Sequence, residues 1–466
     1  MRNIPAMHLI LNTPELKDKI KPNLLVKIIR QEINKIKENS PINLTKEKSD
    51  QEREKLKKII IQNAQAQILK LNELKIKRII NCTGVILNTN LGRIPMAQHL
   101  IDSVASNLTS YIDLEQDIIG GERIDRLRHI SEIFKFLTDC EDCLVVNNNA
   151  SAVMLIVNSL SKNLNVVISR QELIEIGGNF RLPDIITASG GLLKEIGTTN
   201  RTKPQDYTNA TDKTTGIILK CHLSNFQISG FTQSVSIDEL AKLKLKAPIV
   251  YDLGSAFFTG YFDQASEAIL SDFLLNDSII GKTDLISFSG DKLFGGCQAG
   301  IILGKTKYIK KLKSNPLYRA CRVDKITVML LENLLINYLK PSHKINLPAF
   351  NFINQSQENL KLLAQSIAGQ HNDRLDNLTL LPCPTQLLFG GGNITSCQKD
   401  SFGIEIISKH GKKTNYIHKF MRNFDPPILG VAKHDKFVLD LATLLNDDYD
   451  ILLTAIYELD KNILAG

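Results

Sequence analysis

Between residues 140 and 305, short apolar runs alternate with longer amphipathic stretches, and this alternation constrains the fold more than any other feature. Strands that alternate with helices predict a mostly parallel sheet covered by helices. Parallel strands buried on both faces read as continuous apolar runs. The sequence therefore predicts an α/β domain whose strands are CLVVNN, NVVIS, LLKEIG, GIILKCH, PIVYDLG, LISFSG and AGIILG.

We predict three domains along the 466 residues. Residues 1–78 carry apolar residues at three- and four-residue spacing with lysines between them, which predicts a helical N-terminal domain and linker. The α/β domain spans 79–345. Residues 346–466 mix strand-like runs with helical segments, which predicts a small α+β C-terminal domain. The sequence has no run of eighteen apolar residues and no apolar signal-peptide core, so we expect a cytoplasmic protein without a membrane span.

The positive charge is concentrated at the N-terminus. Residues 1–80 hold 18 Lys and Arg against 9 Asp and Glu, a net charge of +9, whereas the remainder holds 39 against 40, a net charge of −1. A basic region on a near-neutral body indicates a polyanionic partner. A solvated, lysine-rich helical face is the alternative that charge alone leaves open.

The eight cysteines are scattered, and only Cys140 and Cys143 form a CxxC pair. A metal site of the zinc type needs a second pair of ligands at suitable spacing, and none follows nearby. We therefore expect reduced thiols and no metal.

A run of asparagines follows the first apolar strand. In open α/β sheets, ligands bind beyond the carboxyl ends of the strands. Asn147, Asn148, Asn149 and Ala150 stand at such an end and lead into a predicted helix. Backbone N–H groups and the helix dipole make this an anion cradle. A helix cap is the alternative, but three asparagines exceed what a cap needs.

Two further strand ends carry an acid and a lysine. Asp252 follows PIVY and is suited to pair with the cationic ring nitrogen of pyridoxal phosphate, although such aspartates also cap helices or bind metals. Lys292 stands in SFSGDKLFGG and is suited to form a Schiff base with the cofactor aldehyde. We expect Ser289 in the same motif to bind the cofactor as well. The order of cradle, acid, lysine and glycine pair favours pyridoxal phosphate over a dinucleotide, because the sequence lacks a G-x-G-x-x-G after the first strand. His222 could stack on the cofactor ring, relay protons or be structural.

Four arginines are candidates to bind an anionic second substrate: Arg93, Arg126, Arg319 and Arg322. Arginine binds phosphate-like anions through two parallel hydrogen bonds. Each could instead be a surface or ion-pairing residue, and the sequence alone does not show that they converge.

Several long motifs resemble the bacterial L-seryl-tRNA(Sec) selenium transferases, also called selenocysteine synthases. The resemblance runs from about residue 75 to 340 and continues more weakly toward FDPPILG and LDLATLL. The motifs that carry it are NTNLGR, VVNNNA, ISRQELIEIGGNFRLPD, EIGTTNRT, YDLGS, SFSGDKLFGG, QAGII and RVDK.

This resemblance implies a pyridoxal-phosphate transferase of fold type I with Lys292 bound to the cofactor. It implies that the basic N-terminal domain recognises the selenocysteine tRNA, and that the chain assembles as a homodecamer. It implies conversion of seryl-tRNA(Sec) to selenocysteinyl-tRNA(Sec) through a dehydroalanyl-tRNA intermediate bound to the cofactor. Selenophosphate is the implied selenium donor, and the four arginines are its implied ligands.

The sequence departs from the family pattern at Asn88, Gln227, Val431 and Ala442, and in FGGGNITSCQKD. These departures keep two alternatives open. One is an enzyme of the same fold that acts on a free amino acid by β-elimination or by sulfur or selenium transfer. The other is a non-catalytic RNA-binding relative, against which the retention of Lys292 argues.

Overall fold

The computed structural model describes residues 5–39, 49–175, 181–223, 226, 228–341, 344–390, 397–411 and 414–464. The chain divides into two compact units, Met1–Arg78 and Ile79–Gly466, and each is described by itself. Gln227 and the stretch at 391–396, where the sequence departs from the family pattern, lie outside the described residues.

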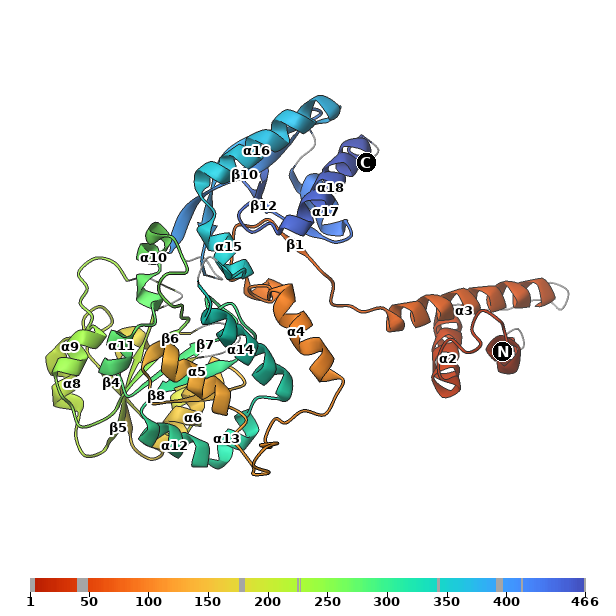
Figure 1. The fold of residues 1–466 in the computed structure, drawn as a ribbon. Helices are drawn as coiled ribbons and strands as arrows, with labels where there is room; N and C mark the ends of the chain where they lie inside the picture. Colours follow the sequence, from red (N-terminus) through yellow and green to blue (C-terminus); the bar gives the residue numbers. More distant parts are fainter. Residues whose placement is uncertain are drawn as a thin grey trace. The chain divides into compact units, whose positions relative to one another are not determined.

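The first unit is helical, as predicted, and its core lies between two long helices. Helix α2 buries Leu25 and Ile29 on one face, while helix α3 contributes Ile60 and Ala64 to the same cluster. Glu32 is also buried, and it accepts hydrogen bonds from Lys35 at 2.6 Å and from Asn63 at 3.1 Å. The helices are α1 Met7–Leu11, α2 Pro22–Asn39 and α3 Ser49–Asn72 (Figure 1).

The second unit contains the central sheet, and each of the seven apolar runs is a strand of it, as predicted. The order is β2-β8-β7-β6-β5-β3-β4 within the described part of the chain. Strand β8 is antiparallel to both of its neighbours, and the other neighbouring pairs are parallel. The strands are β2 Asp142–Val146, β3 Asn165–Ser169, β4 Leu192–Ile196, β5 Thr215–Cys221, β6 Ile249–Gly254, β7 Leu285–Ser289 and β8 Gly300–Gly304.

Helices cover this sheet, and α6 contacts five of its strands, β2, β3, β5, β7 and β8. Helix α5 packs on β2, and α14 packs on both α4 and α5 (Figure 1). The residues of the strands other than β4 are almost all buried, which explains their apolar character, whereas the edge strand β4 is partly exposed and carries Lys194 and Glu195. The helices are α4 Gln98–Leu108, α5 Arg128–Thr138, α6 Asn149–Ser161, α7 Leu182–Ala188, α8 Pro204–Ala210, α9 Ile237–Lys242, α10 Gln264–Ile269, α11 Asp277–Lys282, α12 Thr306–Ser314, α13 Pro316–Cys321 and α14 Lys325–Tyr338.

A second, antiparallel sheet forms the α+β part of the C-terminal region, in the order β12-β13-β10-β9. Helix α16 packs on β9 and β10. Short strand β1 Ile80–Asn81 pairs with β11 Ile428–Leu429, so the segment after Arg78 pairs with the C-terminal region rather than with the central sheet. The remaining elements are β9 Leu378–Leu388, β10 Gln398–Ser408, β12 Val431–Lys433, β13 Lys436–Asp440, α15 Pro348–Asn354, α16 Gln357–His371, α17 Thr414–Asn423 and α18 Tyr449–Asn462.

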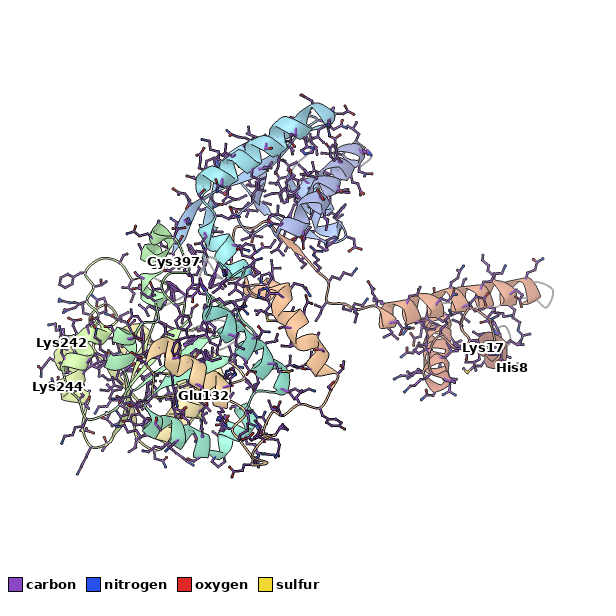
Figure 2. The ribbon with its side chains drawn as sticks, viewed as in Figure 1. His8, Lys17, Glu132, Lys242, Lys244 and Cys397 are labelled. Carbon is purple, nitrogen blue, oxygen red and sulfur yellow. The ribbon has the colours of Figure 1, made fainter. Side chains whose placement is uncertain are left out.

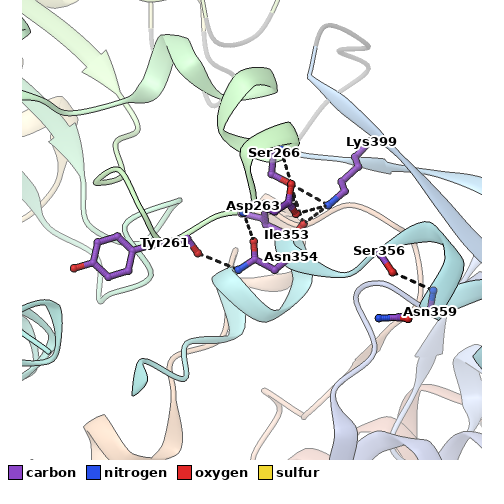
Figure 3. A network of polar contacts seen from close by, with 8 residues as sticks. All are labelled: Tyr261, Asp263, Ser266, Ile353, Asn354, Ser356, Asn359 and Lys399. Atoms are coloured by element: carbon purple, nitrogen blue, oxygen red, sulfur yellow. Dashed lines mark hydrogen bonds and ion pairs between the residues drawn. The ribbon is translucent and has the colours of Figure 1, made fainter. Parts of the chain in front are cut away.

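Lys399 at the start of β10 ties the second sheet to the segment that follows the central strand β6 (Figure 3). Its ammonium group lies 3.1 Å from Asp263, 2.9 Å from Ser266 and 2.8 Å from the carbonyl of Ile353. Asn354 extends the network by accepting a hydrogen bond from the backbone of Asp263 at 3.0 Å. These charged hydrogen bonds to a mostly buried lysine hold β10 of the second sheet against α10 and α15.

The other departures from the family pattern fall on structural positions. Asn88 caps the 3-10 turn η2 Thr89–Leu91 by accepting from the backbone of Asn90. Val431 is exposed on β12, whereas Ala442 is buried and donates its N–H to Asp440 at 2.9 Å. Among the described helices, none is long and apolar enough to cross a membrane.

Candidate active site

A cavity of about 270 Å³ opens beside the carboxyl ends of β2, β6 and β7. Side chains from four separate parts of the sequence meet there, which is the arrangement expected at the edge of a parallel sheet. The lining residues are Arg93, Asn148, Asn149, Ala150, Asp252, Gly254, Ser289, Asp291, Lys292, Gln298 and Ala299.

The predicted anion cradle is the N-terminus of α6. Asn148 is the N-cap, and its side chain accepts from the backbone of Ser151 at 2.8 Å. A Cβ on Gly300 would lie 2.2 Å from the carbonyl oxygen of Asn148, so only glycine lets β8 pass this close. Asn147 does not line the cavity, since it is exposed and its backbone N–H donates to Cys321 at 2.9 Å.

Asp252 is buried at the end of β6 and is held by two donors. One carboxylate oxygen accepts from the Asn149 amide at 2.7 Å and from the Ser287 hydroxyl at 3.3 Å. Burial raises the pKa of Asp252, and the Asn149 hydrogen bond opposes this by favouring the charged form. The carbonyl oxygen of the Asn149 side chain is buried without a hydrogen-bond partner among the described residues, so a bound group could donate to it.

Lys292 is partly buried and lies in the turn between β7 and β8. Its carbonyl accepts from the backbone of Gly295, whose φ of +73° suits glycine. Desolvation lowers the pKa of the Lys292 amine, and the nearby Arg93 lowers it further, while Asp252 and Asp291 oppose the shift. These effects increase the neutral fraction of the amine, which is the form that attacks an aldehyde.

Arg93 reaches the cavity from a segment that lies 198 residues away from Asp291 in the sequence. Its guanidinium donates to both carboxylate oxygens of Asp291 at 2.6 Å. The backbone of Arg93 has a φ of +66°, a left-handed conformation that few non-glycine residues adopt. The turn after η2 and the ion pair therefore fix this cation beside Lys292.

The structure does not bring the four predicted arginines together within one chain. Arg126 and Arg322 line a second cavity of about 220 Å³, where both contact Glu115. Arg319 is exposed on α13 and does not line either cavity. Only Arg93 faces the cavity that contains Lys292.

His222 follows β5 and does not line the cavity, although its backbone N–H donates to the carbonyl of Asp252 at 2.9 Å. Its ring packs at 4.4 Å from the ring of Phe273, and its Nε2 lies 3.7 Å from Asp272. Stacking of His222 on a cofactor ring therefore stays a prediction.

Sequence reasoning missed three residues at this site. Ser287 contacts Asp252 because β6 and β7 pair there in register, which no local pattern reveals. Asp291 was visible beside Lys292, but its pairing with Arg93 was not. Gln298 lines the cavity from the turn that enters β8.

The residues of the cavity fit pyridoxal phosphate. A lysine amine, a buried carboxylate and a helix N-terminus are the three groups that bind its aldehyde, its ring nitrogen and its phosphate. The buried side-chain oxygen of Asn149 has no hydrogen-bond partner among the described residues, so it is a polar atom that a bound group could contact.

Three comparisons with known proteins place the chain. The family model described as L-seryl-tRNA selenium transferase matches residues 79–445. The L-seryl-tRNA(Sec) selenium transferase of Carboxydothermus hydrogenoformans is 35% identical over 463 residues, covering 97% of this chain and 96% of the relative. That of Alkaliphilus oremlandii is 37% identical over 393 residues, covering 83% and 82%.

Among solved structures, D-glucosaminate-6-phosphate ammonia-lyase matches with a TM-score of 0.57 at 16% identity, covering 83% of this chain and 96% of that chain. This likeness supports the fold alone, which is fold type I of the pyridoxal-phosphate enzymes. The extent of the sequence matches decides the relationship: the chain belongs to the L-seryl-tRNA selenium transferase family.

Proposed function

We propose that this protein converts seryl-tRNA(Sec) to selenocysteinyl-tRNA(Sec), with pyridoxal phosphate as cofactor and selenophosphate as selenium donor. Membership of the family supports the reaction. The observation that carries the proposal is the placement of Lys292, Asp252 and the N-terminus of α6 around one cavity.

Each of these residues has a role that its surroundings support. Pyridoxal phosphate, when bound, supplies an electron-withdrawing ring that stabilises negative charge on the carbon next to an amino group. Asp252, whose charged form the Asn149 hydrogen bond favours, would hold the proton on the ring nitrogen. Lys292 would hold the cofactor and then move the proton of the seryl α-carbon. The backbone N–H groups at Asn149 and Ala150 would hold the phosphate.

The remaining assignments concern the substrates and the assembly. We propose that the basic unit Met1–Arg78 binds the tRNA, because helix α2 exposes Lys27 and Arg30 on the face opposite its buried leucine and isoleucines. Selenophosphate would be bound by arginines from among Arg93, Arg126, Arg319 and Arg322. A homodecamer and a cytoplasmic location complete the proposal.

The test is a turnover assay with protein saturated with pyridoxal phosphate. Selenophosphate is supplied together with seryl-tRNA(Sec), an ordinary seryl-tRNA or free serine, and the amino acid product is identified. We expect selenocysteine from seryl-tRNA(Sec) alone. The Lys292→Ala variant should be inactive, and Lys242→Ala should be fully active because Lys242 is an exposed lysine of α9 (Figure 2).

Two outcomes would contradict the proposal, and each points to an alternative. Turnover of free serine, with no reaction of seryl-tRNA(Sec), would establish an enzyme of the same fold that acts on a small molecule. Failure of borohydride to trap the cofactor on Lys292, with tRNA binding intact, would establish a non-catalytic RNA-binding relative.

A further inference from the structure

The turn that carries Lys292 joins β7 to β8 and closes on its own backbone. The N–H of Gly296 donates to the carbonyl of Gly290 at 2.8 Å, and the N–H of Gly295 donates to the carbonyl of Lys292 at 2.9 Å. These hydrogen bonds set the shape of the turn, but both of them lie within it. The position of the turn relative to the cavity therefore depends on its contacts with other elements.

Tyr338, the last residue of α14, supplies one of these contacts. Its hydroxyl donates to the carbonyl of Phe294, two residues after Lys292, at 2.8 Å. Among the described residues this is the one hydrogen bond that the Phe294 carbonyl accepts. Both residues are buried, so neither group can turn to water instead. The hydroxyl therefore anchors the lysine turn to α14.

The surroundings of Tyr338 keep its hydroxyl neutral and fix its direction. Burial raises the pKa of Tyr338 well above its usual value, so the phenol remains a donor at neutral pH. The centre of its ring lies 5.1 Å from those of Phe258, Tyr261 and Phe294. Aromatic rings packed at this separation hold one another in a preferred orientation. The hydroxyl is thus aimed at the turn by the cluster around it.

Two further contacts hold the same turn. A Cβ on Gly296 would lie 2.7 Å from the side chain of Leu334, so α14 lies directly against the backbone of the turn. The hydroxyl of Ser255, just beyond β6, accepts from the N–H of Leu293 at 3.3 Å. Leu293 directly follows Lys292, so this second hydroxyl acts close to the lysine. Its longer hydrogen bond makes it the weaker of the two anchors.

We propose that Tyr338 is a positioning residue for Lys292, and that its hydroxyl, with Ser255 as a second anchor, holds the turn so that the amine meets the cofactor aldehyde. This inference rests on the proposed function, in which Lys292 holds the cofactor. Neither Tyr338 nor Ser255 lines the cavity in the described part of the chain, so both act through the backbone of the turn. A loosened turn should slow the reaction of the amine without weakening the binding of the ring and phosphate.

The experiment mixes cofactor-free Tyr338→Phe with pyridoxal phosphate and follows visible absorbance as the Lys292 nitrogen bonds to the aldehyde carbon and water leaves. The rate at saturating cofactor should fall about tenfold, the factor that one hydrogen bond of ordinary strength represents. Pyridoxamine phosphate has the same ring and phosphate but no aldehyde, so its affinity should not change. The two results together separate a misplaced lysine from a damaged cavity.

Tyr261→Phe is the matched control. It removes a hydroxyl from the same aromatic cluster, but this hydroxyl donates to the carbonyl of Tyr338 at 2.8 Å instead of to the turn. Its rate should stay within twofold of the parent. Amide hydrogen exchange gives a second readout that needs no cofactor: the N–H groups of Gly295 and Gly296 should exchange about tenfold faster in Tyr338→Phe and at the parental rate in Tyr261→Phe.

Two results would overturn the inference: a parental rate in folded Tyr338→Phe, or an equal slowing in Tyr261→Phe, which would indicate a general effect of the aromatic cluster. If Tyr338→Phe does not fold, Ser255→Ala replaces it. A slower reaction with unchanged pyridoxamine phosphate affinity would then support the anchored turn, and a parental rate would refute it. If the parent itself forms no bond with the cofactor, the proposed function fails, while the exchange rates still test the anchoring.

Discussion

The hydrogen bond from Asn149 to Asp252 offers the sharpest test of the cofactor site. At 2.7 Å, between an amide and a buried carboxylate, it is the shorter of the two side-chain hydrogen bonds that the carboxylate accepts. Asn149→Ala leaves Ser287 at 3.3 Å. A hydrogen bond to a charged group contributes about 1.5–3 kcal/mol. The affinity for pyridoxal phosphate should therefore fall about 10- to 150-fold, since the cofactor needs the ionised carboxylate.

The loss of affinity for pyridoxal phosphate in Asn149→Ala should be larger at low pH than at high pH. Without the Asn149 amide, the pKa of Asp252 rises further, so the carboxylate becomes ionised only at higher pH. Cofactor binding should then be weakest at low pH and recover as the pH rises. In the cofactor-free protein, the stability contributed by this carboxyl is fully present below its unfolded pKa and is lost as the pH rises through the raised folded pKa.

The assay is a titration of cofactor-free protein with pyridoxal phosphate, followed by visible absorbance at several pH values. Asn158→Ala is the matched control, because Asn158 lies on the same helix and bonds to Ser189 and Asn315 instead of the cavity. An affinity within twofold of the parent, an equal loss in the control, or a loss that is independent of pH would refute the reasoning.

Three further predictions follow from packing and charge. Gly300→Ala should abolish cofactor binding, because the new Cβ would lie 2.2 Å from the Asn148 carbonyl and push the cradle aside; a titration with the cofactor checks this. Replacing Lys27 and Arg30 with alanine should weaken tRNA binding and reduce the slope of log affinity against log salt by about 1–2, measured by filter binding. Lys399→Met should lower the free energy of unfolding by about 1–3 kcal/mol in urea, because it removes the hydrogen bonds that join β10 to α10.

Much of the fold could be read from the sequence, because each strand carries its own signal. A strand buried on both faces is mostly apolar, so most of the seven runs were visible by their apolar residues, although the edge strand β4 is partly exposed and carries Lys194 and Glu195. The short strand β1 was not, because two residues that pair with Ile428 and Leu429 leave no periodic pattern. The glycines around Lys292 were readable for a similar local reason, since a turn that passes close to other backbone excludes side chains.

The candidate site, too, could be predicted from the sequence only in part. The sequence by itself determined which residue types stand at the strand ends, and so it indicated Lys292, Asp252 and the start of α6. Only the tertiary structure decided which charges meet. Arg93 pairs with Asp291, while Arg126 and Arg322 pair with Glu115 in another cavity. The physical reason is that a side chain's partner depends on strand order and on where distant loops cross, and local sequence fixes neither.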